Sequence, residues 1–228
     1  MGASSSRQTM SAPVVVAATA RHTATLIFLH GLGDTGHGWA DLFRSLKLSN
    51  LKCVCPTAPI QPVTLNGRMR MPSWFDIFDL SPQGPEDEEG ILNASNLLKN
   101  LIDEEIQQGI SSERIVVGGF SQGGAVALYT AFTQEKPLAG IIALSTWMPL
   151  HSKFPGVVKG NRNIPILQCH GKQDPLVPCK WGELTAMLAK GLSNKLEFKT
   201  YNMMHSSSPE EMQDVKDFLV KLLKLEES

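Results

Sequence analysis

The chain has 228 residues, 42% of them hydrophobic and 19% charged, and a formal net charge of -1, which fits one globular domain with a sizeable core. The balanced charge argues against a nucleic-acid partner, because proteins that bind phosphate backbones usually carry a basic excess. No apolar run approaches the ~20 residues that span a bilayer and no signal-peptide core is visible, so we expect a cytoplasmic protein.

The first predicted element is a mobile N-terminal tail over residues 1–20, and residues 21–228 are expected to form the single domain. The tail begins "MGASSSRQTMSAP", which has few large apolar groups. Gly2 and Ser6 fit the myristoylation pattern M-G-x-x-x-[ST], a short pattern that also recurs by chance. Acylation of Gly2 is therefore left open.

A strand is predicted at 23–30, "TATLIFLH", and a glycine-rich loop follows it. Residues 31–36 of this loop fit the dinucleotide fingerprint G-x-G-x-x-G. A dinucleotide-binding fold also needs an acidic residue about 20 positions further on, to hold the ribose hydroxyls. Between Leu42 and Phe75 there is no Asp or Glu, so the pattern does not predict a nucleotide site, and no cofactor is expected.

The next predicted strand, "LKCVCP" at 51–56, contains two of the four cysteines. The spacing Cys53-x-Cys55 differs from the C-x₂₋₄-C spacing of structural zinc, so no metal site is expected. Thiols in apolar strands are commonly buried and free, which favours a reducing compartment. Residues 57–86 then form a long connection without clear periodicity, and such loops are often functional.

A helix is predicted from about Asp87 to Gln107, with an acidic first turn and Gly109 just beyond its end. A strand at 114–120 then runs into "GFSQG", residues 119–123, which a helical pattern follows. Strand, G-x-S-x-G and helix together are typical of a nucleophile elbow, in which a strained turn exposes the serine. The pattern favours Ser121 as a nucleophile over a plain glycine-rich turn.

Three further strands are predicted at 140–145, 164–170 and 196–201. A serine nucleophile needs a base and an acid, which follow in the order serine, acid, histidine in hydrolases with this elbow. Asp174 comes just after the strand at 164–170. His205 comes just after the last strand and is the one histidine downstream of that acid. The carboxyl ends of parallel strands meet at one edge, so Ser121, Asp174 and His205 are predicted to converge there.

The alternation of strands and helices predicts an α/β fold with a mainly parallel central sheet and helices on both faces. The last helix is expected to begin at Ser208, with Pro209 in its first turn and Glu211 completing a capping box. In such enzymes one oxyanion donor comes from a loop after an early strand and the other from the residue after the nucleophile. We therefore assign the backbone N–H groups of Leu32 and Gln122.

Five blocks of sequence carry a resemblance: "FLHGLGDTGHGWA", "PTAPIQPVTLNGRMRMPSWFDI", "GGFSQGGAVALYTA", "LQCHGKQDPLVP" and "FKTYNMMHSS". With them the chain resembles the cytosolic acyl-protein thioesterases, α/β-hydrolases that are also described as lysophospholipases. The resemblance covers about residues 24–224 and implies a catalytic triad of Ser121, Asp174 and His205. It also implies hydrolysis of palmitate from S-acylated cysteines of membrane-associated proteins, with some activity on lysophospholipids, and transient contact with a membrane surface.

An acyl chain needs an apolar lining, and the long connection is rich in large apolar groups. The residues predicted to bind the acyl chain are Met71, Trp74, Phe75, Ile77, Leu80, Trp147 and Leu176. Packing of the same groups onto the core is the alternative. Two other functions stay open: a carboxylesterase or lysophospholipase that acts mainly on oxygen esters, and a hydrolase-like protein that binds lipid without turnover.

Two features of the chain differ from the acyl-protein thioesterases that it resembles. Its members carry an N-terminal cysteine that can be acylated, whereas "MGASSS" has none. The turn before the Met-Met-His segment is one residue shorter here and has Asn202 where glycine is usual. Asparagine can adopt the left-handed conformation that glycine would supply, so His205 is kept as the base.

Overall fold

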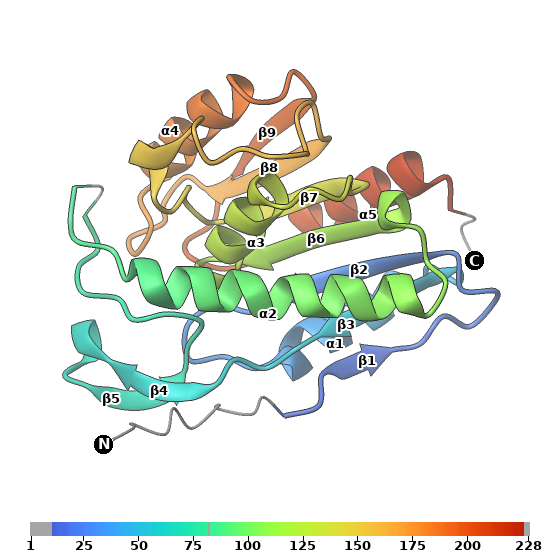
Figure 1. The fold of residues 1–228 in the computed structure, drawn as a ribbon, viewed down its shortest axis with the longest axis horizontal. Coiled ribbons are helices and arrows are strands. Elements are labelled where there is room, and N and C mark those ends of the chain that lie inside the picture. Colours follow the sequence, from blue (N-terminus) through green and yellow to red (C-terminus); the bar gives the residue numbers. More distant parts are fainter. Residues whose placement is uncertain (1–10, 82, 226–228) are drawn as a thin grey trace.

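The computed structural model describes residues 11–81 and 83–225, which form a seven-stranded sheet covered by helices, with a separate two-stranded hairpin (Figure 1). The strands of the large sheet are β1 (Val14–Val16), β2 (Ala24–Leu29), β3 (Leu51–Cys55), β6 (Ile115–Phe120), β7 (Gly140–Leu144), β8 (Ile166–Gly171) and β9 (Leu196–Tyr201). The hairpin consists of β4 (Ile60–Val63) and β5 (Met69–Pro72). The helices are α1 (Gly36–Ser45), α2 (Glu88–Gln107), α3 (Gln122–Thr133), α4 (Cys179–Lys190) and α5 (Pro209–Leu223), with short 3₁₀ turns η1 (Thr64–Asn66), η2 (Ser112–Arg114) and η3 (His151–Lys153).

The strand order in the large sheet is β1-β3-β2-β6-β7-β8-β9, and every neighbouring pair is parallel except β1 with β3. Strands β2, β7 and β8 are buried along their whole length, because helices cover both faces of the sheet. Helices α1 and α5 pack on one face, and α2, α3 and α4 lie on the other. The mainly parallel α/β sheet predicted from the apolar runs is confirmed.

The predicted N-terminal tail, residues 1–20, includes residues that belong to the sheet. Val14–Val16 form β1, in which Val14 pairs with Cys55 and Val16 pairs with Cys53. Three consecutive β-branched residues favour an extended strand at the open edge of β3, although the segment lacks larger apolar groups. Gly2 and Ser6 lie outside the described residues.

The connection at 57–86 is more ordered than its lack of periodicity indicated. Its first half is the β4–β5 hairpin, with Ile60 opposite Pro72 and Val63 opposite Met69. These strands have four residues each and both contain proline, so neither shows the alternation that identifies a longer strand. Asp76 accepts hydrogen bonds from the N–H and the hydroxyl of Thr64, which ties the hairpin to the chain that follows.

The two helix starts predicted from sequence are correct. Asp87 caps α2 by accepting a hydrogen bond from the N–H of Gly90, and Ser208 caps α5 by accepting one from the N–H of Glu211. The capping box, however, is only half formed. The carboxyl group of Glu211 is buried without a hydrogen-bond partner among the described residues, instead of reaching back to the first turn.

Candidate active site

Ser121 sits at a sharp turn between β6 and α3, with a φ of 53° that a non-glycine residue rarely adopts. The flanking glycines make this turn sterically possible. A Cβ on Gly119 would lie 2.3 Å from the carbonyl carbon of Gly123, and a Cβ on Gly123 would lie 2.3 Å from the carbonyl oxygen of Leu29. The backbone of the elbow therefore packs directly against β2, and Ser121 is held at the carboxyl end of the sheet.

Gly123→Ala is expected to lower kcat/KM by at least about 100-fold, because the new methyl group must displace the elbow from β2 and misplace the serine. Steady-state kinetics on an acyl thioester measure the effect. Gly38→Ala is the matched control, since a Cβ at this position in α1 would meet only Asp34, at ordinary contact distance. Equal activity of the two variants would show that the elbow tolerates the shift.

Asp174 and His205 are joined by a hydrogen bond of 2.6 Å between Nδ1 of His205 and Oδ2 of Asp174. Asp174 follows β8 and His205 follows β9, so neighbouring parallel strands bring the two side chains to one edge. The second carboxylate oxygen, Oδ1, accepts hydrogen bonds from the N–H groups of Leu176 and Val177, at 2.9 and 2.8 Å. Hydrogen bonds to both oxygens thus fix the orientation of the Asp174 carboxylate.

Burial by itself would raise the pKa of Asp174, but the hydrogen bonds from His205 and Val177 outweigh it and hold the pKa below its usual value. Asp174 is therefore ionised at neutral pH and can only accept the bond from Nδ1 of His205. When Nδ1 of His205 donates its proton to this bond, the lone pair of Nε2 can take a proton. The pair is arranged as a base with its orienting acid.

The imidazole of His205 packs on the ring of Phe120, with 4.7 Å between ring centroids, and Phe120 directly precedes Ser121. The imidazole of His205 thus lies beside the elbow. Among the described residues no hydrogen bond joins the Ser121 hydroxyl to His205. Catalytic hydrogen bonds of this kind often form only when substrate binds.

Leu32 and Gln122, the two predicted oxyanion donors, belong to the loop after β2 and to the start of α3. Leu32 belongs to the loop after β2, which passes close to the elbow: a Cβ on Gly31 would lie 3.4 Å from Cβ of Ser121. Gln122 is the first residue of α3, where N–H groups have no intrahelical acceptor. Both residues are thus placed near the serine by different elements.

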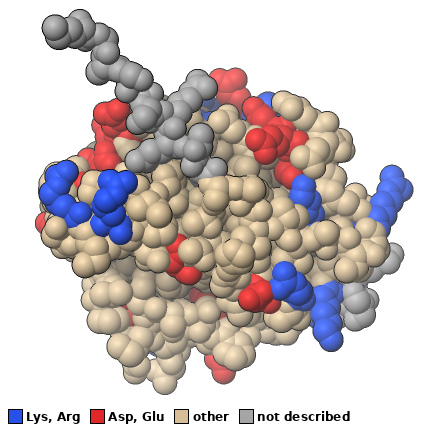
Figure 2. All heavy atoms as spheres, turned by 90° about the horizontal axis from the view of Figure 1, so that it is seen from below, with Lys and Arg blue, Asp and Glu red and all other residues tan. Residues whose placement is uncertain are grey.

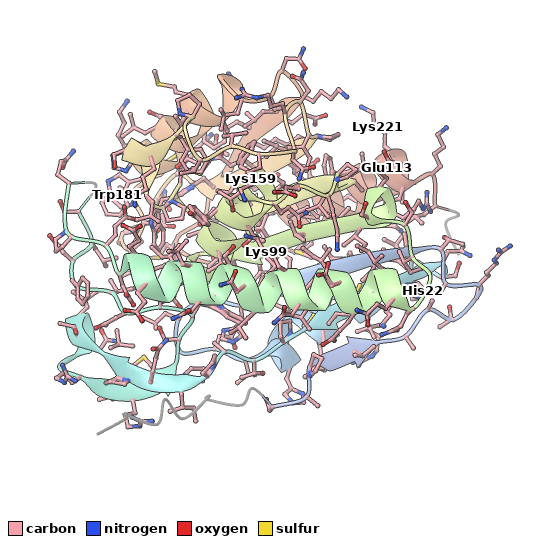
Figure 3. The ribbon with its side chains drawn as sticks, viewed as in Figure 1. His22, Lys99, Glu113, Lys159, Trp181 and Lys221 are labelled. Atoms are coloured by element: carbon pink, nitrogen blue, oxygen red, sulfur yellow. The ribbon has the colours of Figure 1, made fainter. Side chains whose placement is uncertain are left out.

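A cavity of about 310 Å³ lies next to this edge of the sheet. Four of the residues predicted to bind an acyl chain line it: Phe75, Ile77, Leu80 and Trp147. The lining also includes Phe78, Met148 and four residues of α4 that sequence reasoning missed, namely Trp181, Leu184, Thr185 and Leu188. In Figure 3 Trp181 lies between α4 and the loop that leads into α2. The helical pattern of "KWGELTAMLAK" was the available signal for this wall.

Three of the residues predicted to bind the acyl chain lie outside the cavity lining. Trp74 is a buried core residue, and its indole N–H donates to the carbonyl oxygen of His30. Met71 lies in the hairpin, where its sulfur accepts a hydrogen bond from Asn66. Leu176 is 53% exposed on the loop after β8. Large apolar side chains suit a core, a hairpin and a cavity equally, so the sequence could not separate these cases.

Leu184→Trp is expected to lower kcat/KM for a palmitoyl thioester about 10-fold relative to an octanoyl one, because the larger side chain reduces the depth of the cavity. Activity across a series of acyl chain lengths measures the effect. Met187→Trp is the matched control on the same helix, since Met187 is 68% exposed and outside the lining. An unchanged chain-length profile in Leu184→Trp would place the acyl chain elsewhere.

In the described part of the chain, no three His, Cys, Asp or Glu side chains lie close enough together to hold a metal ion. Within the same residues, no helix combines the length and the hydropathy that crossing a membrane requires.

The fold and the elbow define an α/β-hydrolase. The chain belongs to the family described as Phospholipase/Carboxylesterase, whose model matches residues 10–223. It is 47% identical to an acyl-protein thioesterase 1 of Gibberella zeae, over 93% of this chain and 96% of that protein, and 45% identical to one of Neurospora crassa, over 92% and 91%.

Two solved structures are also similar to this chain. The crystal structure of Zea mays acyl-protein thioesterase 2 has a TM-score of 0.84 at 35% identity and covers 92% of this chain and 98% of its own. That of Arabidopsis thaliana SOBER1 has a TM-score of 0.83 at 32% identity and covers 88% and 99%. The α/β-hydrolase fold and the resemblance to acyl-protein thioesterases are confirmed, and the protein is a hydrolase of the thioesterase or esterase type.

Proposed function

We propose that this hydrolase cleaves the thioester of S-palmitoylated cysteines on membrane-associated proteins, with Ser121, His205 and Asp174 as its catalytic triad. The observation that carries the proposal is the 2.6 Å hydrogen bond from His205 to Asp174, made by a histidine that packs against the strained serine elbow. Relatives named acyl-protein thioesterases support the thioester as the bond that is cleaved.

In the proposed mechanism Nε2 of His205 takes the proton of Ser121 as the hydroxyl oxygen attacks the thioester carbonyl carbon. The negative charge that develops on the carbonyl oxygen is stabilised by the N–H groups of Leu32 and Gln122. The C–S bond then breaks, the thiolate receives the proton held by His205, and an acyl-serine ester remains. Water, activated by the same histidine, hydrolyses this ester to release the fatty acid.

We place the acyl chain in the cavity beside the serine. Ser121 is not among the residues that line the cavity, but hydrogen bonds connect two parts of the cavity wall to the elbow. Phe75 lines it and accepts a hydrogen bond from the side chain of Gln122, and Trp147 follows Thr146, whose hydroxyl donates to the carbonyl of Ser121. A chain that leaves the serine therefore has apolar surface within reach.

Lysophospholipids are the second substrate class we propose, because their single acyl chain is held by an oxygen ester that the same triad can attack. The family description Phospholipase/Carboxylesterase supports this side activity. A preference for oxygen esters over thioesters is the alternative function.

Transient contact with a membrane surface would bring the enzyme to acylated proteins. The β4–β5 hairpin suits such contact, since Ile60, Leu65 and Met69 are exposed beside Arg68 and Arg70. Figure 2, the view from below, shows basic side chains close together at its left edge, the side on which Figure 1 has this hairpin. The cytoplasmic location stays a prediction.

Rates on matched substrates test the proposed function. A palmitoyl-cysteine peptide and its palmitoyl-serine counterpart differ only in the leaving atom, and we expect kcat/KM to be at least about 10-fold higher for the thioester. Ser121→Ala should abolish turnover of both substrates. A higher value for the oxygen ester would favour the alternative, and turnover by Ser121→Ala would remove the serine from the mechanism.

A further inference from the structure

The two N–H groups of the proposed oxyanion hole come from elements far apart in sequence, and the sheet does not fix both. Strands β2 and β6 pair as far as Leu29 and Gly119. Gln122 is the first residue of α3, two residues after the end of β6, whereas Leu32 lies in the loop after β2. Something besides strand pairing must hold this loop if the two donors are to act on one oxygen atom.

The loop that contains Leu32 is held by the segment Pro72–Phe75. The N–H of Gly33 donates to the carbonyl oxygen of Pro72 at 2.8 Å, and the indole N–H of Trp74 donates to the carbonyl oxygen of His30 at 2.8 Å. These bonds hold the loop two residues before and one residue after Leu32.

The side chain of Gln122 holds the same segment from the other side. Its Oε1 accepts from the N–H of Trp74 at 3.0 Å, and its Nε2 donates to the carbonyl oxygen of Phe75 at 2.7 Å and to the hydroxyl of Ser73 at 3.0 Å. Gln122, Ser73, Trp74 and Phe75 are all buried. Bonds of this kind are costly to leave unmade, so they fix the segment firmly to α3.

We propose that the side chains of Trp74 and Gln122 are positioning residues, which hold the N–H groups of Leu32 and Gln122 at a fixed separation through the segment Pro72–Phe75. The inference rests on the proposed function and adds to it a role for two side chains that touch no substrate. It also explains why Trp74, predicted to bind the acyl chain, is buried away from the cavity. Losing a positioning bond shifts a donor and weakens binding of the transition state more than binding of the substrate.

Trp74→Phe tests the proposal, since it removes the indole N–H and keeps an aromatic ring. With an acetyl thioester, whose acyl group is too short to need the cavity, we expect kcat to fall between about 10-fold and 100-fold at unchanged KM. The affinity for a trifluoromethyl ketone, a mimic of the tetrahedral intermediate, should fall by the same factor. Tyr201→Phe is the matched control, since it removes the hydroxyl by which a buried side chain donates to Asp214, away from the elbow, and keeps the aromatic ring. Its kcat should stay unchanged.

Gln122→Glu is the second variant and keeps the main-chain N–H. Its ionised carboxylate cannot donate to the carbonyl oxygen of Phe75, but the protonated form can. The ratio of its kcat to the wild-type value should therefore rise as the pH is lowered. Wild-type kcat in both variants, or a change confined to KM, would overturn the proposal. Turnover by Ser121→Ala is a different result, which would overturn the proposed function instead.

Discussion

Asp174→Asn is expected to lower kcat by about 10⁴-fold while leaving KM nearly unchanged. The carboxylate accepts the bond from Nδ1 of His205 and two backbone N–H groups through its other oxygen. An amide can keep the two backbone bonds only through its oxygen, which turns its NH₂ group toward His205. The imidazole must then carry its proton on Nε2, where it cannot accept the proton of Ser121.

Steady-state kinetics and the rate of labelling by a fluorophosphonate measure this effect. The control is Asp214→Asn, a carboxylate that accepts hydrogen bonds from Lys199 and Tyr201 between β9 and α5, away from the elbow. We expect this control to retain wild-type kcat. A loss of less than about 10-fold in Asp174→Asn would show that His205 is oriented by another group.

Glu211→Gln is expected to stabilise the protein increasingly as the pH rises from about 5 to 8. Burial raises the pKa of Glu211 to about 8, and the charge of Asp214 contributes. The folded protein therefore keeps a proton on this group at pH values where the unfolded chain has lost it. Its contribution to stability is fully present below the unfolded pKa and is lost as the pH rises toward 8.

The difference in the free energy of unfolding between variant and wild type should grow by on the order of 4 kcal/mol over this range. Urea unfolding at several pH values measures it. Glu210→Gln is the matched control in the same turn of α5, because Glu210 is exposed. If the stabilities of Glu211→Gln and wild type run parallel between pH 5 and 8, the carboxyl group is ionised in the folded state.

The parts of the fold that could be predicted are those with local causes. Apolar runs identify strands that helices cover on both faces, and the glycines around Ser121 are needed for a turn that forms within five residues. The order of Asp174 and His205 after neighbouring strands was enough to predict that they lie near each other, and their side chains are hydrogen-bonded in the structure.

The parts that could not be predicted depend on partners distant in sequence. Val14–Val16 form a strand on the open edge of β3. Glu211 is buried in α5, which packs on the sheet, and does not complete its capping box. Trp74 packs in the core, where its indole N–H donates to the carbonyl oxygen of His30, whereas the neighbouring Phe75 lines the cavity. Sequence patterns report that a residue is apolar, but only tertiary contacts determine whether it lines a cavity or packs in the core.

The most direct test of the proposed mechanism is the mass of the protein shortly after it is mixed with a palmitoyl thioester. We predict a transient covalent palmitoyl adduct, located by peptide mapping on Ser121 and absent from Ser121→Ala. In His205→Ala the adduct should form much more slowly, because the serine lacks its base. Turnover of the thioester without an adduct in wild type, or an adduct on another residue, would contradict the mechanism.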